Sequence, residues 1–173
     1  MDYKLLVRVE MINLPAGQNR VFLIAEIASS HDGDRAKMSK AIQVAKEAGA
    51  DAVKFQWCSS PERLAARRHA EEYLWAYRTI AFQQEWLAEL KAECDGVGIE
   101  FLCTAYLPED IPIIAPLIQR FKVASFETGD RDFILAHKEY EKPVIVSLGM
   151  IRTAREMNDL LHDLLDMVGV GGI

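Results

Sequence analysis

The sequence has 173 residues, half of them apolar, which is enough for one domain with a sizeable core. Its formal net charge of −6 and its pI near 5.3 argue against a nucleic-acid partner, because phosphate binding needs clustered lysines and arginines. No segment is long and apolar enough to predict a membrane span, and the opening MDYKLLVRVE carries charges where a signal peptide would be apolar. Three cysteines without a CxxC spacing favour reduced thiols and a cytoplasmic location.

Apolar runs along the chain predict five β-strands. Each run is nearly continuous rather than alternating, which is typical of parallel strands that are buried on both faces. The predicted strands cover residues 21–28, 52–57, 99–105, 121–125 and 144–148.

Amphipathic segments between and after these runs predict helices. Residues 34–48 place their apolar side chains on one face at helical spacing. Residues 79–94 repeat an apolar residue at every fourth position from Phe82 onward. Residues 153–168 begin with the capping-box pattern TARE and continue with a wide apolar stripe.

Two connecting stretches are less regular. Residues 58–77 predict a long loop plus a helix, and they contain the basic cluster Arg63, Arg67 and Arg68. Because nearby glutamates dilute this cluster, we interpret it as a solvated helix face. Residues 107–120 contain three prolines, and a proline in a helix interior costs about 3 kcal/mol, so any helix there must be short or broken.

The isolated histidines and cysteines give weaker signals. His31 lies in a polar loop, where a histidine is more often a hydrogen-bonding or helix-start residue than a ligand. His69, His137 and His162 fall on predicted helices, and we interpret them as surface residues. Cys103 lies in an apolar run and is expected to be buried.

The alternation of strands and helices predicts an α/β fold, either a doubly wound sheet or a (β/α) barrel. Polar side chains near the strand ends favour the barrel, because barrel sites gather there, and no strand is followed by a dinucleotide-binding glycine turn. A complete barrel needs eight strands and about 250 residues. We therefore predict a partial (β/α) TIM-type barrel of about five parallel strands, forming a single truncated domain over residues 1–173.

Short motifs stand at the predicted strand ends: AEIASSHDGD (25–34), AGADAVKFQ (48–56), IEFLCTAY (99–106), FKVASFE (121–127) and KPVIVSLGM (142–150). In this order they resemble the N-terminal part of the barrel in the N-acetylneuraminate (sialic acid) synthase family, over about residues 21–160. The resemblance implies an enzyme that condenses phosphoenolpyruvate with N-acetylmannosamine or a related amino sugar and releases phosphate. In the family a small antifreeze-like domain follows the full barrel.

Phosphoenolpyruvate is a small trianion, which needs cations and hydrogen-bond donors around it. Lys54 and Lys122 lie in or beside apolar strands, where an unpaired ammonium would be costly. Two such lysines favour an anion site over the alternatives, which are pairing with nearby carboxylates or reaching to solvent. The resemblance implies that both lysines bind phosphoenolpyruvate together with Thr104, Ser125 and Ser147.

Two glutamates are the candidate catalytic residues. Glu26 interrupts the first strand and could pair with a lysine across the barrel, whereas the resemblance places it in the active site, holding the sugar or polarising a group. Glu127 resembles the family glutamate that contacts the sugar, and the alternative for it is a solvated loop charge. The sequence departs from the family at Phe126, where the family usually has glycine, and in TAY (104–106), which replaces the usual Thr-Pro.

The resemblance implies a divalent metal, manganese or magnesium, whose histidine ligands come from strands beyond the fifth. The sequence shows no cluster of histidines and carboxylates with metal-ligand spacing, so we expect no metal site in this chain.

Three functional hypotheses stay open. The first is a sialic acid synthase-like enzyme that is inactive as this short chain, with phosphoenolpyruvate and an amino sugar as its small-molecule partners. The second is a non-catalytic oligomeric remnant that binds a small anionic ligand, because the open strand edges of a partial barrel attract partners and favour a homo-oligomer. The third is another phosphoenolpyruvate- or aldol-type barrel that acts on a different sugar.

Overall fold

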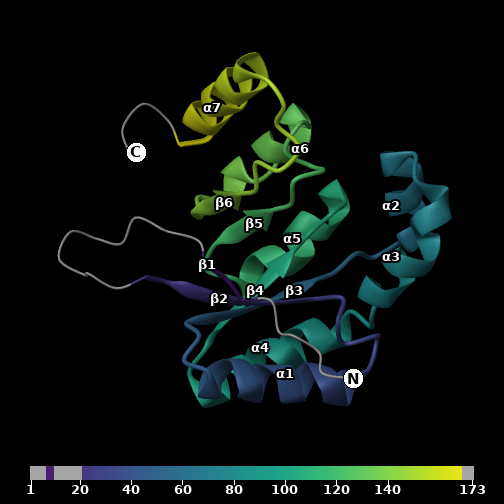
Figure 1. The fold of residues 1–173 in the computed structure, drawn as a ribbon, viewed down its shortest axis with the longest axis vertical. Coiled ribbons are helices and arrows are strands. Elements are labelled where there is room, and N and C mark those ends of the chain that lie inside the picture. Colours follow the sequence, from purple (N-terminus) through teal and green to yellow (C-terminus); the bar gives the residue numbers. More distant parts are fainter. Residues whose placement is uncertain (1–6, 10–20, 169–173) are drawn as a thin grey trace.

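The computed structural model describes residues 7–9 and 21–168, whose strands form two small sheets with helices packed around them (Figure 1). The first sheet has the order β1-β2-β3-β4, in which β2, β3 and β4 are parallel and β1 runs antiparallel to β2. The second sheet consists of the parallel pair β5 and β6. The strands are β1 (Val7–Val9), β2 (Leu23–Ala28), β3 (Ala52–Gln56), β4 (Glu100–Thr104), β5 (Phe121–Val123) and β6 (Val144–Val146).

The prediction of an α/β fold with five parallel strands is confirmed. The strands of the described residues do not close into a barrel. Strands β4 and β5 contact each other, but they belong to two separate sheets. The short antiparallel strand β1 was not predicted. Its residues Val7–Val9 pair with Leu23–Ala25, so they cover only the first half of the outer edge of β2.

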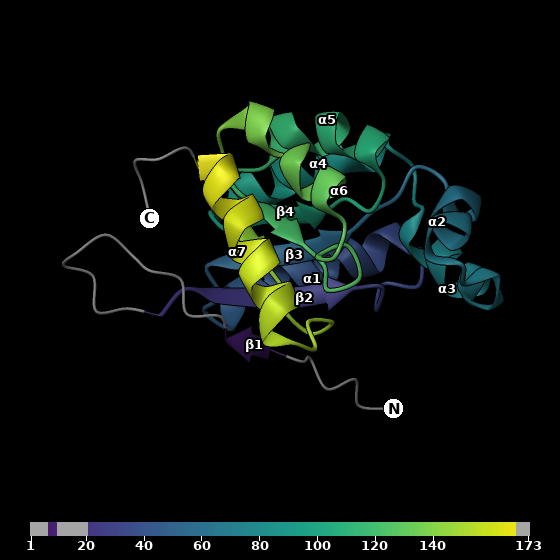
Figure 2. The ribbon, with the colours of Figure 1, turned by 90° about the horizontal axis from the view of Figure 1, so that it is seen from above.

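Helices α1 (Arg35–Glu47) and α4 (Glu85–Val97) pack against each other on one side of the first sheet, and α6 (Arg131–Leu135) and α7 (Ala154–Val168) lie together at the opposite end (Figure 1). Helices α2 (Pro61–Arg68) and α3 (Leu74–Ile80) stand together to one side of β3, as Figure 2 also shows. The shorter elements are η1 (Glu71–Tyr73), η2 (Pro108–Asp110), α5 (Ile111–Ile114), η3 (Ala115–Leu117) and η4 (Lys138–Tyr140).

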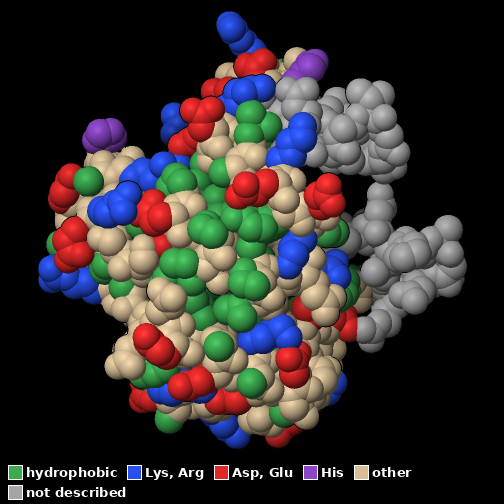
Figure 3. Space-filling model, turned by 180° about the vertical axis from the view of Figure 1, so that it is seen from behind, with side chains coloured by type: hydrophobic (Ala, Val, Ile, Leu, Met, Phe, Trp, Pro, Cys, Tyr) green, Lys and Arg blue, Asp and Glu red, His purple; other side chains and the backbone are tan. Residues whose placement is uncertain are grey.

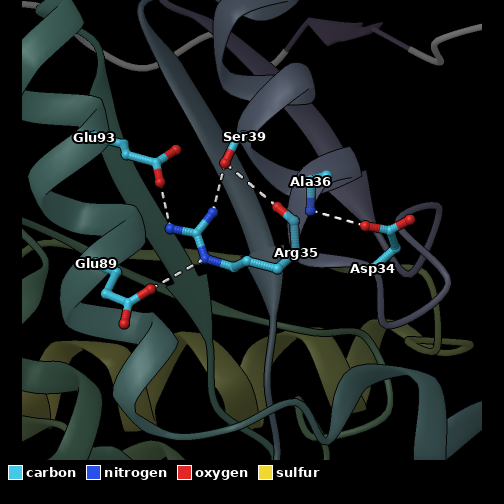
Figure 4. A network of polar contacts seen from close by, with 6 residues as sticks. All are labelled: Asp34, Arg35, Ala36, Ser39, Glu89 and Glu93. Carbon is cyan, nitrogen blue, oxygen red and sulfur yellow. Dashed lines mark hydrogen bonds and ion pairs between the residues drawn. The ribbon is translucent and has the colours of Figure 1, made fainter.

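The start of α1 is capped and fixed to α4 (Figure 4). Asp34 accepts hydrogen bonds from backbone N–H groups of the first helical turn. The guanidinium of Arg35 donates to Ser39 Oγ at 2.6 Å, and it forms ion pairs with Glu89 at 3.3 Å and with Glu93. These contacts join the two helices that cover the outer face of the sheet.

Two helix predictions need correction. The predictions for 34–48 and 153–168 are confirmed by α1 and α7, and so is that for the proline-rich stretch. The segment 79–94 does not form one helix, because α3 ends at Ile80 and α4 begins at Glu85. Phe82 lies between them, and its carbonyl accepts a hydrogen bond from Trp57 Nε1 at 2.9 Å. The segment 58–77 holds two helices rather than one. The proline-rich stretch forms only the four-residue α5 between two 3₁₀ turns, as predicted.

The strands have an outer and an inner face. Outward-facing side chains such as Val53, Phe55 and Phe101 belong to the main core, together with residues of α1 and α4. On the inner face, Ile24, Ala52 and Leu102 pack together with Ile145 of β6. This small apolar layer therefore contains side chains from both sheets.

The inner face becomes polar toward the carboxyl ends of the strands. Because side chains two residues apart share a face, Glu26, Lys54 and Thr104 follow Ile24, Ala52 and Leu102 on the same side. Lys122 lies between Phe121 and Val123, which both belong to the main core, so it also belongs to the inner face. The fold thus places the predicted polar residues above one apolar layer.

Figure 3 shows the face opposite to that of Figure 1, where apolar side chains gather over the centre and charged ones surround them. Within residues 7–9 and 21–168, no helix combines the length and the apolar character that a membrane span needs.

Candidate functional site

Three of the predicted site residues meet at the carboxyl ends of β2, β3 and β4. The Lys54 ammonium donates to Thr104 Oγ1 at 3.1 Å and forms an ion pair with Glu26 Oε2 at 2.8 Å. Lys54 is only 4% exposed, whereas the Glu26 side chain is about one-third exposed. Glu26 thus balances a buried ammonium from the neighbouring strand and also reaches the surface.

A second group of predicted residues meets on β5 and at the end of β6. The Lys122 ammonium donates to Ser147 Oγ and to the carbonyl of Val123, and Lys122 is 7% exposed. Thr128 Oγ1 lies 2.7 Å from the carbonyl of Ser147 and 3.1 Å from that of Ala124, so it links the turn after β5 to the end of β6.

Ser125 lies in the turn after β5, close to the backbone of Gly149. A Cβ atom on Gly149 would stand 2.9 Å from Ser125 Oγ, which is too close for an unshifted serine hydroxyl. The glycine after the VIVSL strand therefore leaves room for the Ser125 hydroxyl in its present position. Sequence inspection singled out Ser125 but not Gly149.

Glu127 is not a solvated loop charge, because it is 2% exposed and pairs with an arginine. Its Oε1 accepts from Arg68 Nε at 2.9 Å and from Arg68 Nη2 at 2.5 Å, and its Oε2 is buried without a hydrogen-bond partner. Burial raises the pKa of the Glu127 carboxyl above its usual value, while the neighbouring Arg68 acts in the opposite direction.

The interpretation of the basic cluster as a solvated helix face is therefore wrong for two of its three arginines. The Arg68 side chain is 12% exposed, and Arg67 forms an ion pair with Asp130 at 2.5 Å. Arg63 is exposed, as expected. The last turn of α2 turns inward because its two final arginines find carboxylates in the turn after β5.

Two hollows open beside this turn. The first has a volume of about 530 Å³, and Arg67, Arg68, Glu127 and Asp130 are among its lining residues. The second has a volume of about 470 Å³ and is lined by Ser125 and Thr128 together with residues of α7 and the loop before it. The exposed ring of Phe126 borders both hollows.

The histidines divide differently from the prediction. His31 is buried against Phe55 and Phe82, and its Nδ1 accepts from the backbone N–H of Gly33 at 3.0 Å, which confirms a hydrogen-bonding role. His137 is buried and not on the surface, because its Nδ1 donates to the carbonyl of Phe133 at 2.9 Å near the end of α6. Burial lowers the pKa of both imidazoles.

The cysteines are also possible metal ligands, because a thiolate can bind a metal ion. Cys103 is buried, as predicted, and so are Cys58 and Cys94. Within the described ranges, histidine, cysteine and carboxylate side chains form no group of three or more that could hold a metal ion. The described residues therefore do not fit the divalent metal that the sequence resemblance implies.

The sequence itself decides the family. The family model of NeuB matches residues 41–165. This chain belongs to the NeuB family. It is 31% identical over 153 residues to the pseudaminic acid synthase of Campylobacter jejuni, a match that covers 80% of this chain and 43% of that protein. It is 28% identical over 145 residues to the human N-acetylneuraminate-9-phosphate synthase, covering 78% of this chain and 40% of that protein.

Solved structures show the same fold in this NeuB-family chain. The N-acetylneuraminic acid (sialic acid) synthetase of Leptospira borgpetersenii, in complex with citrate, superposes with a TM-score of 0.74 at 22% identity, covering 92% of this chain and 56% of that one. A truncated 3-deoxy-D-arabino-heptulosonate 7-phosphate synthase of Thermotoga maritima gives a TM-score of 0.64 at 15% identity, covering 91% of this chain and 54% of that one. The NeuB-family chain spans about two fifths of the length of the two curated relatives named above.

Within this NeuB-family chain, the predicted site residues fall into three local groups: Glu26 with Lys54 and Thr104, Lys122 with Ser147, and Glu127 with Arg68. Ser125 lies beside Gly149 rather than in one of these contacts. Sequence reasoning named Arg67 and Arg68 but assigned them to a solvated face, and it missed Gly149. The sequence contains a basic end of α2 and an acidic turn after β5, and these opposite charges could have suggested that Arg68 pairs with Glu127. Nothing in the local sequence shows that the two segments are in contact.

Proposed function

We propose that this chain forms the phosphoenolpyruvate-binding part of a sialic acid synthase-like enzyme. The observation that supports the proposal is the pair of buried lysines, Lys54 and Lys122, on one inner face of the sheets. Keeping an ammonium in such a place costs free energy unless acceptors surround it. A ligand with several negative charges gives both lysines a common partner.

The partners of Lys54 leave it able to bind an anion. An ammonium has three N–H donors, and Lys54 uses two of them for Glu26 and Thr104. The third can reach a phosphate or carboxylate oxygen of the ligand. In this proposal Glu26 balances the lysine before the ligand arrives and orients it afterwards, while the hydroxyls of Thr104, Ser125 and Ser147 donate to the ligand.

The proposed reaction forms a carbon–carbon bond between C3 of phosphoenolpyruvate and the aldehyde carbon of an amino sugar, such as N-acetylmannosamine. The C=O double bond of the aldehyde opens and its oxygen takes up a proton. Water then adds to C2 of phosphoenolpyruvate and gives up a proton, and the C2–O bond breaks as inorganic phosphate leaves. The two lysines stabilise the anionic groups, and the apolar layer below them excludes water from that side. Glu26 and Glu127 are the proposed catalytic residues, and the carboxylate of Glu127 accepts a hydrogen bond from a hydroxyl of the sugar.

Calorimetric titration of the chain with phosphoenolpyruvate tests the binding role. Charge-assisted hydrogen bonds contribute about 1.5–3 kcal/mol, so Lys54→Met and Lys122→Met are each expected to weaken binding by about 10- to 150-fold. Lys40→Met is the matched control, because Lys40 is an exposed lysine of α1. Equal affinity of Lys54→Met, Lys122→Met and the unmutated chain would refute the proposed anion site.

A second candidate function is a non-catalytic protein that binds a small anion and self-associates. It is favoured by the absence of a three-ligand metal group within the described ranges and by the open arrangement of the two sheets. Both candidates predict phosphoenolpyruvate binding. They differ in amino-sugar binding: the first candidate predicts that the chain also binds N-acetylmannosamine, and the second predicts that it does not.

A further inference from the structure

The carboxylate of Glu127 has one engaged and one unengaged oxygen. Both hydrogen bonds from Arg68 go to Oε1, whereas Oε2 is buried and has no hydrogen-bond partner. A buried acceptor without a donor is costly, so such an atom needs an explanation. Glu127 also lines the hollow of about 530 Å³ beside the turn after β5.

Arg68 is held in place by more than its ion pair. Its guanidinium carbon lies 4.8 Å from the ring centres of Tyr106 and Phe126 and 5.4 Å from that of Tyr77. A guanidinium among aromatic faces gains cation–π attraction and loses freedom to turn. The three rings come from different segments, so the position of Arg68 depends on the whole surrounding fold.

This arrangement fixes the direction of the carboxylate. Two N–H groups of a planar guanidinium hold one oxygen, and the other oxygen is left as an oriented acceptor. The other charged and titratable groups beside the pair come from several segments. They are Arg67 on α2, Tyr77 on α3, Tyr106 after β4, Asp130 in the same turn, and Arg131 and Asp132 at the start of α6. A ligand that carries a hydrogen-bond donor can complete the bonding of Oε2.

We propose that Arg68 is a positioning residue, which holds Glu127 so that its Oε2 accepts a hydrogen bond from a hydroxyl or amide N–H of the amino sugar. The inference rests on the function proposed above and adds the residue that orients its sugar-binding glutamate. Arg68 itself does not touch the reacting atoms. Its effect on the sugar passes through the orientation and the charge of Glu127.

The test is an NMR titration of the chain with N-acetylmannosamine between pH 5.5 and 8.5. We expect Arg68→Met to weaken sugar binding at least tenfold at pH 6, with affinity recovering as the pH rises. The reason is that burial raises the pKa of Glu127, and loss of the guanidinium raises it further, so the accepting carboxylate forms only at higher pH. Arg68→Lys keeps a cation and is expected to retain sugar binding with a flatter pH profile.

Arg63→Met is the matched control, because Arg63 is an exposed arginine on the same helix that pairs with Glu109. The proposal is overturned if Arg68→Met binds the sugar like the control across the pH range, or if the unmutated chain does not bind it. Titration of the same samples with phosphoenolpyruvate separates the positioning role of Arg68 from the anion site proposed above. If the unmutated chain does not bind phosphoenolpyruvate, that result counts against the anion site and not against the role of Arg68.

Discussion

The ion pair between Arg68 and Glu127 predicts a large and pH-dependent effect on stability. Both side chains are nearly buried, so Arg68→Met leaves a carboxylate inside the protein without its partner. Breaking a buried pair from one side typically costs 3–5 kcal/mol, and we expect about 3 kcal/mol at pH 8 because Arg67 stays nearby. For a chain of this size that loss lowers the melting temperature by about 6–12 °C.

The sign of the pH dependence follows from the pKa of Glu127. In the unfolded chain a glutamate titrates near pH 4.3, as a rough reference value, whereas burial raises the pKa of Glu127 in the folded chain. The folded state of Arg68→Met therefore holds its proton more tightly than the unfolded state. Its stability is lost as the pH rises from the unfolded pKa through the folded one, so the variant is closer to the unmutated chain at pH 5 than at pH 8.

Urea unfolding at pH 5 and pH 8 measures this effect. The double variant Arg68→Met/Glu127→Gln removes the stranded charge, and we expect it to regain much of the loss at pH 8. Arg63→Met, which breaks an exposed pair, is expected to change stability by about 0–1 kcal/mol. The reasoning is refuted if Arg68→Met loses no more than Arg63→Met at pH 8, or loses equally at both pH values.

Four further predictions follow from the site and the surface. Gly149→Ala is expected to displace the Ser125 hydroxyl and weaken phosphoenolpyruvate binding about three- to tenfold in calorimetry, with no further loss when Ser125→Ala is added. Phosphate release from phosphoenolpyruvate and N-acetylmannosamine with manganese should stay at background, because the described residues present no three-ligand metal group, and clear turnover would contradict this. Light scattering should give twice the 19.5 kDa mass of one chain, because within the described segments β6 pairs along one edge only and α7 exposes Leu161. A monomer at micromolar concentration would oppose this prediction. Burial raises the pKa of the thiols of Cys58, Cys94 and Cys103 to about 12. A thiol reagent at pH 8 should therefore label none of these cysteines before denaturant is added, and rapid labelling would oppose this prediction.

The parallel strands could be predicted because their signal is local. Each is a short apolar run, and the lysines inside two of them, Lys54 and Lys122, stand out without knowledge of any contact. The shared inner face of the two lysines is seen only in the structure, where the outward-facing neighbours of each belong to the main core.

The elements that sequence reasoning missed depend on distant partners. Strand β1 forms because it pairs with β2, which is distant from it in the sequence, and no local pattern of residues predicts that pairing. The break between α3 and α4 falls at Phe82, whose apolar spacing fits a helix but whose carbonyl bonds to Trp57 instead. In both cases a tertiary contact decides against the local pattern.

The same reason explains why the surroundings of Glu127 were not foreseen. In the sequence, Arg68 is judged beside the glutamates of its own helix, and by that measure it belongs on the surface. In the fold it meets a carboxylate 59 positions away and three aromatic rings. A buried charge is destabilising unless partners from several segments of the chain surround it. A binding site is also built from side chains of several segments. The buried charges that break the local rule therefore mark this turn as the part of the chain where substitution most directly tests function.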